Sequence, residues 1–119
     1  TEIDAVHQAV RELYPNKKVT GIFQPHLFSR TQDFMADFAH ELSQVDELLL
    51  VPIYPAREVP IDGVTSEAIL SQMTLNNAKC IPKEDVLVEL KNTKIEVLLT
   101  LGAGDIDRLV QPIKEYYGG

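Results

Sequence analysis

Hydrophobic positions change spacing repeatedly along the chain, and these changes predict helices separated by short buried strands. Between residues 3 and 13 the apolar residues recur at helical spacing. Continuous apolar runs at 18–23, 47–52 and 95–101 instead indicate strands that are buried on both faces. The remaining expected elements are helices at 31–44, 66–73, 83–90 and 105–117, a weak strand at 79–81 and a long loop at 53–65.

This order of elements predicts an α/β fold: a Rossmann-like, three-layer αβα sandwich with a mostly parallel sheet. We expect one domain over residues 1–119, because no internal linker or repeat interrupts the pattern. Right-handed crossovers place the carboxyl ends of all the strands at one edge of such a sheet. The connections at His26, Tyr54 and Gly102 should therefore lie together there.

Composition narrows the possible partners. Eleven basic and eighteen acidic side chains give a net charge of −7, and the basic residues are scattered, so we expect no nucleic-acid partner. No apolar run is long enough to span a membrane. The acidic N-terminus shows no secretory signal, and the single Cys80 fits a reducing compartment. We therefore expect a cytoplasmic protein.

The elbow from Gln24 to Thr31 (QPHLFSRT) carries the most distinctive chemistry of the chain. Arg30 can hold a carboxylate through two parallel hydrogen bonds, beside backbone amides that lack partners inside the next helix. The alternative is an exposed arginine paired with Asp33 or Glu58. His26 either bonds a ligand or ties down the elbow, and the sequence favours neither.

Other polar residues near this edge have weaker assignments. Ser29 could cap the helix or touch a ligand, whereas Thr31 is expected to cap it, and Ser66 to cap a later helix. The loop from Tyr54 to Glu58 brings a phenol, a guanidinium and a carboxylate to the edge. The glycine-rich turn at 102–104 is interpreted as a tight turn with Asp105 as N-cap, because it lacks the residues of a phosphate loop. No spacing indicates a metal site, and no residue is assigned as catalytic.

Three segments together resemble the C-terminal domain of the Mur ligases: FQPHLFSRT at 23–31, YPARE at 54–58 and GAGDI at 102–106. The resemblance covers essentially the whole chain and is closest to the member that adds L-alanine. It implies that Arg30 and His26 bind the L-alanine, with possible support from Ser29, Tyr54 and Glu58.

The resemblance also implies a reaction and its partners. Members are cytoplasmic enzymes of peptidoglycan synthesis that form an amide bond at the expense of ATP. ATP phosphorylates the carboxylate of UDP-N-acetylmuramate, and the amine of L-alanine attacks the acyl phosphate and expels phosphate. The C-terminal domain positions the amino acid and closes over ATP. ATP and Mg²⁺ are bound mainly by the N-terminal and central domains, so the isolated domain is expected to be inactive.

Two departures from the family pattern lead to further expectations. A segment Asp-Asp-Tyr-Gly-His-His-Pro precedes a Thr-Glu pair in the family, so a chain that starts at Thr1 is expected to lack the first strand of the domain. Leu27 stands where many members have arginine, which leaves Arg30 a larger share of carboxylate binding. The alternative to a ligase domain is a free-standing, receiver-like α/β binding or signalling module.

Overall fold

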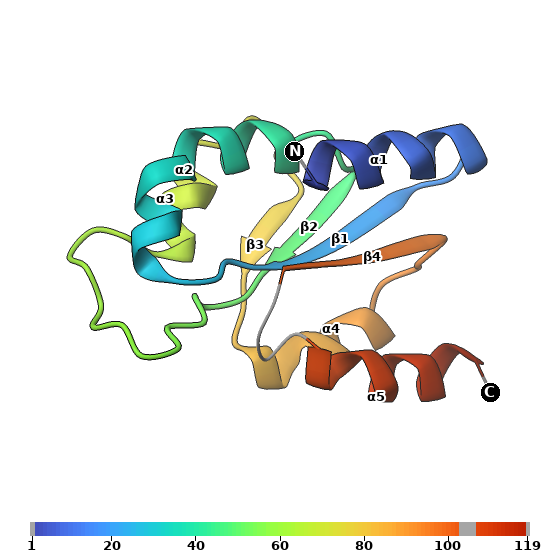
Figure 1. The fold of residues 1–119 in the computed structure, drawn as a ribbon. Coiled ribbons are helices and arrows are strands. Elements are labelled where there is room, and N and C mark those ends of the chain that lie inside the picture. The colour runs from blue at the N-terminus through green and yellow to red at the C-terminus, as the bar shows by residue number, and fades with distance from the viewer. Residues whose placement is uncertain (1, 103–106, 119) are drawn as a thin grey trace.

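A computed structural model describes residues 2–102 and 107–118. Helices and strands alternate along the chain, as the hydrophobic pattern predicted (Figure 1). The helices are α1 (Glu2–Leu13), α2 (Phe28–Leu42), α3 (Ser66–Ser71), the 3₁₀-helix η1 (Lys83–Asp85), α4 (Val86–Lys91) and α5 (Asp107–Gly118). The strands are β1 (Val19–Gln24), β2 (Glu47–Leu50), β3 (Ala78–Cys80) and β4 (Val97–Gly102).

The four strands form one sheet in the order β3-β2-β1-β4, and every neighbouring pair is parallel. Helices α1, α2 and α3 cover one face of the sheet, and α4 and α5 cover the other (Figure 1). This arrangement confirms the predicted three-layer αβα sandwich. Among the described helices, none is long and apolar enough to cross a membrane.

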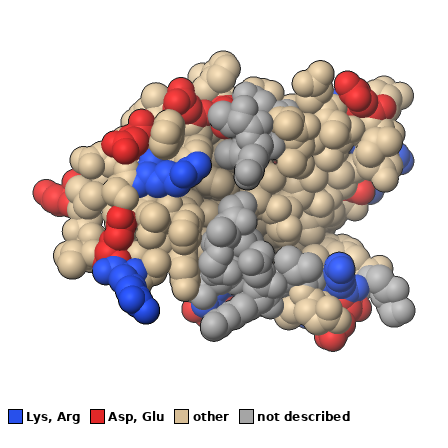
Figure 2. Space-filling model, viewed as in Figure 1, with Lys and Arg blue, Asp and Glu red and all other residues tan. Residues whose placement is uncertain are grey.

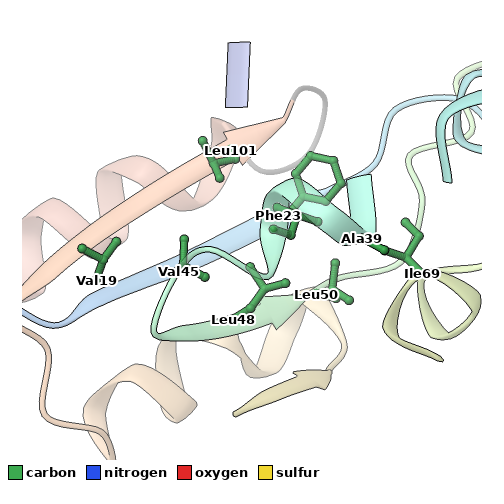
Figure 3. Close-up of a cluster of buried hydrophobic side chains, with 9 residues drawn as sticks. Val19, Phe23, Ala39, Val45, Leu48, Leu50, Ile69 and Leu101 are labelled. Atoms are coloured by element: carbon green, nitrogen blue, oxygen red, sulfur yellow. The ribbon is translucent and has the colours of Figure 1, made fainter. Parts of the chain in front are cut away.

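The central strands are buried on both faces because apolar residues occupy both sets of alternating positions. Val19, Phe23, Leu48 and Leu50 point towards the α1–α3 side and form one core cluster with residues of α2 and α3 (Figure 3). Ile22, Leu49 and Val51 point the other way and pack with Val86, Leu90 and Ile113. The sheet is therefore held by a core on each side.

The start of α3 differs from the prediction. Thr65 rather than Ser66 is the N-cap, and its hydroxyl accepts a hydrogen bond from the Ala68 amide at 3.0 Å. The Ser66 side chain is buried and donates to the Val51 carbonyl at 2.6 Å. Both residues have hydroxyls that could cap the helix, and the bond to Val51, directly after β2, decides that the Ser66 side chain points inwards. The Asp105 cap and the turn at 103–104 lie outside the described residues.

At the end of the sheet where the strands begin, the Asp46 side chain bonds to residues of both β1 and α1. Its carboxylate accepts a hydrogen bond from the Val19 amide at 2.7 Å and pairs with the Arg11 guanidinium at 3.2 Å. Burial raises the pKa of the Asp46 carboxyl, but the Val19 amide and the Arg11 charge outweigh it and hold that pKa below its usual value. The ionised form is therefore favoured by folding.

Replacing Asp46 with asparagine is expected to lower the free energy of unfolding by about 1 kcal/mol at neutral pH, because a partly exposed charged acceptor is lost. A pKa that is lower in the folded state stabilises the fold above the unfolded-state pKa, and this contribution is lost progressively as the pH falls through the folded-state pKa. In urea unfolding, the difference in stability between the variant and the parent should therefore be larger at pH 7 than at pH 3. Asp37→Asn, at an exposed position of α2, is the matched control. An equal loss at both pH values would contradict the assignment.

Candidate functional site

The carboxyl ends of β1 and β4 mark the point where the chain connections change direction. β1 leads into α2 on one face of the sheet, whereas β4 is followed by α5 on the other face (Figure 1). The last pair in the β1–β4 register is Gln24 with Gly102. Open α/β sheets bind ligands in the crevice outside such a switch point. The elbow after β1 therefore occupies the position where this architecture most often places a site.

The elbow and the loop after β2 remain paired beyond the ends of their strands. His26 and Tyr54 form a parallel bridge, in which the Leu27 amide donates to the Tyr54 carbonyl and the Tyr54 amide to the Pro25 carbonyl, both at 2.8 Å. The rings of His26 and Tyr54 stack with centroids 5.6 Å apart and 13° between their planes. The prediction that these two connections meet at one edge is confirmed. Tyr54 supports the His26 ring through this stacking.

Helix α2 starts at Phe28, three residues earlier than predicted. Ser29 and Arg30 therefore lie in its first turn rather than before it. Thr31 does not cap the helix, because its side chain is fully buried and its hydroxyl donates to the Leu27 carbonyl at 2.8 Å. The N-cap is Leu27, which makes no side-chain capping bond and has φ 69° and ψ 136°. Such a conformation is unfavourable for a residue with a Cβ atom, and it often marks a functional elbow.

Glu58 supplies the missing cap from the loop after β2. Its Oε1 accepts a hydrogen bond from the Ser29 amide at 3.0 Å, and its Oε2 accepts one from the Ser29 hydroxyl at 2.5 Å. These bonds hold the pKa of the Glu58 carboxyl below its usual value, and the nearby His26 acts in the same direction. An amide that the sequence suggested for a ligand carboxylate thus already binds a carboxylate of the chain. The alternative pairing of Arg30 with Glu58 does not occur, because Glu58 contacts Ser29.

The Arg30 side chain is exposed, and its guanidinium carbon lies 5.6 Å from the centre of the Phe34 ring. Helical spacing predicts that Phe34 lies on the buried apolar face of α2, but this prediction is wrong, because 44% of the residue is exposed. The backbone of α2 bends at Phe34, with φ −118° and ψ 18°, so this position departs from regular helical geometry. Phe34 therefore lies beside the candidate site residue Arg30, which helical periodicity could not show. The one signal in the sequence was its four-residue separation from Arg30.

A shallow hollow of about 180 Å³ opens at the same edge of the sheet. Its lining residues are Gln24, Pro52, Ile53, Pro82, Lys83 and Glu84. Ligand pockets for drug-sized molecules usually exceed about 300 Å³, so we assign no ligand to it. Within residues 2–102 and 107–118, no group of histidine, cysteine and carboxylate side chains has the arrangement of a metal site. On the face shown in Figure 2, the basic side chains are well separated from one another.

Comparison with known proteins identifies the class. In the crystal structure of UDP-N-acetylmuramate–alanine ligase from Thermotoga maritima, a region equal to 24% of that chain matches 98% of this one, with a TM-score of 0.70 and 27% identity. No protein-family model matches the chain. The fold thus corresponds to the C-terminal region of a Mur ligase, as the three sequence segments predicted.

Relatives in sequence point to one member of this class. UDP-N-acetylmuramate–L-alanine ligase from Flavobacterium johnsoniae is 56% identical over 97% of the chain, and the same enzyme from Cytophaga hutchinsonii is 54% identical over 96%. The chain covers 26% and 24% of these two relatives, so it spans about a quarter of their length. It is therefore matched to the C-terminal region of the alanine-adding ligase, and the receiver-like alternative is not favoured.

Proposed function

We propose that residues 1–119 are the C-terminal domain of an ATP-dependent ligase that joins L-alanine to UDP-N-acetylmuramate in peptidoglycan synthesis. The observation that carries the proposal is the 56% identity with such a ligase over 97% of the chain. In this proposal the protein is cytoplasmic. The domain holds the amino acid and closes over ATP, while the rest of the enzyme supplies the other substrate sites.

In the proposed site, Arg30 pairs with the carboxylate of L-alanine and His26 contacts or supports it. An exposed guanidinium in the first turn of α2 can form two parallel bonds with a carboxylate. Stacking on Tyr54 limits the orientations open to the His26 ring. A carboxylate anchor is useful for so small a substrate, because a single methyl group contributes only about 1–3 kcal/mol of discrimination. Ser29, Tyr54 and Glu58 support the elbow.

The contribution of this domain to the reaction is positioning. Holding the amine of L-alanine in line with the acyl phosphate of UDP-N-acetylmuramate can lower the barrier by several kcal/mol, because translational and rotational freedom is already lost. Closure of the domain would also exclude water from the hydrolysable acyl phosphate. ATP and Mg²⁺ are assigned mainly to the other domains, as the family resemblance implies, and the sequence of this chain has no phosphate loop.

A full-length ligase that carries this chain as its C-terminal region is expected to release phosphate from ATP only when UDP-N-acetylmuramate and L-alanine are both present. The 119-residue chain alone should release none, because it provides no phosphate loop. A coupled phosphate assay with each substrate omitted in turn tests this. Full turnover without L-alanine, or with a different amino acid in its place, would refute the proposed function.

A further inference from the structure

The first turn of α2 is held by a carboxylate from a distant segment. The first amides of a helix have no partners inside it, and a side chain at the N-cap usually accepts one of these bonds. Leu27 cannot do so, and Glu58 accepts instead from both the amide and the hydroxyl of Ser29. The two residues are 29 positions apart. Tertiary structure thus provides what the local sequence lacks.

The loop that carries Glu58 is itself fastened to the elbow. Tyr54 exchanges backbone hydrogen bonds with Pro25 and Leu27, and its ring stacks on His26. The Glu58 amide donates to the Pro55 carbonyl at 2.9 Å, which closes a turn between the bridge and the carboxylate. Glu58 is therefore presented to α2 by a short segment that is anchored at both ends.

These contacts hold the strained backbone of Leu27 in place. A residue with positive φ persists only where its surroundings hold it in place. The Leu27 amide is bonded to Tyr54, and its carbonyl accepts from both the hydroxyl and the amide of Thr31. Glu58 secures the other side of the elbow through Ser29, the residue directly before Arg30. Release of Glu58 would let the first turn of α2 relax and displace the guanidinium.

We propose that Glu58 is a positioning residue for the amino-acid site, which acts through Ser29 to hold the first turn of α2 and so orients Arg30. This inference rests on the proposed function. Glu58 does not bind the substrate, because both of its oxygens face Ser29. The Ser29 amide is then not accessible to the substrate carboxylate. The carboxylate binds to the neighbouring Arg30 instead.

The test uses Glu58→Gln and Ser29→Ala in a full-length ligase that carries this chain. Glu58→Gln keeps the size of the side chain but removes its charge, and we expect the KM for L-alanine to rise about three- to tenfold. The KM for ATP and kcat should stay within about twofold, because positioning of the amino acid alone changes. Ser29→Ala should raise the KM for L-alanine less, since the hydrogen bond from the residue 29 backbone amide to Glu58 remains. Ser29→Thr, which keeps a hydroxyl, should have the KM of the parent. In the double variant the two effects should not add.

Asp62→Asn is the matched control, because it removes one exposed carboxylate from the same loop. It should leave all the kinetic constants unchanged. A lower KM for L-alanine in Glu58→Gln would overturn the inference, since Glu58 would then compete with the substrate carboxylate for the helix amides. An unchanged KM, or a fall in kcat with KM constant, would overturn it as well.

Failure of the inference is distinguishable from failure of the proposed function. If Arg30→Ala raises the KM for L-alanine and Glu58→Gln leaves it unchanged, only the positioning role is refuted. If neither variant changes the KM for L-alanine, the proposed amino-acid site is refuted. The amide resonance of Ser29 provides a readout without substrate, and it should shift in Glu58→Gln because its acceptor loses its charge.

Discussion

Replacing Arg30 with alanine in the full-length ligase is expected to raise the KM for L-alanine by about 10- to 100-fold, the loss expected for a hydrogen-bonded pair of charges. The guanidinium is exposed, lies in the first turn of α2, and rests beside the Phe34 ring. Leu27 cannot compensate, because it offers no charge where many Mur ligases have arginine. The KM for ATP should change by less than about threefold, since the lost contact is with the amino acid.

Arg57→Ala provides the matched control for this experiment. Arg57 is an exposed arginine in the loop that follows β2, so its removal changes the net charge by the same amount. Steady-state kinetics with L-alanine and ATP varied separately should show a selective effect in Arg30→Ala and none in Arg57→Ala. Equal effects in the two variants would mean that general electrostatic attraction, rather than a direct contact, holds the carboxylate. No effect in either would remove Arg30 from the site.

Replacing Leu50 with alanine is expected to lower the free energy of unfolding by about 2–5 kcal/mol, because the substitution leaves a cavity in a packed core. Leu50 is fully buried and lies on β2, between Phe23 of β1 and Cys80 of β3 in the sheet register. It belongs to the core cluster shared with Phe23, Leu48 and Ile69 (Figure 3). A loss of this size approaches the whole stability of many small domains.

Urea unfolding followed by circular dichroism measures this effect. Val59→Ala is the control, because 80% of Val59 is exposed and its truncation should change stability by less than about 0.5 kcal/mol. A loss below about 1 kcal/mol in Leu50→Ala would mean that the core collapses easily around the missing atoms, or that β2 is not central to it.

The layered fold was predictable because burial on both faces of a strand leaves a local trace. Apolar residues occupy both alternating sets in β1 and β2, and few other structures tolerate such short continuous runs. The handedness of crossovers then placed the polar connections at one edge, where His26 and Tyr54 are found. The residues that carry the family resemblance lie in these polar connections, which follow the buried strands.

The detailed errors have one physical origin, which is competition between local preference and contacts from distant segments. Thr31 has a hydroxyl suited to capping, yet α2 begins earlier and the residue is buried. Ser66 has the same chemistry, yet its hydroxyl bonds to the Val51 carbonyl just after β2, and Thr65 is the N-cap. Neighbouring residues with similar propensities can exchange roles at little cost, so packing selects between them.

Local patterning was thus sufficient for the parallel sheet, its two covered faces and the edge at which the polar residues gather. Two features of the candidate site depended on the folded chain. Glu58 caps α2 across 29 residues, and a bend in the helix brings Phe34 out of the core and beside Arg30. The Glu58 cap leaves no periodic signal because it joins distant segments, and the bend leaves none because regular helical geometry ends at Phe34.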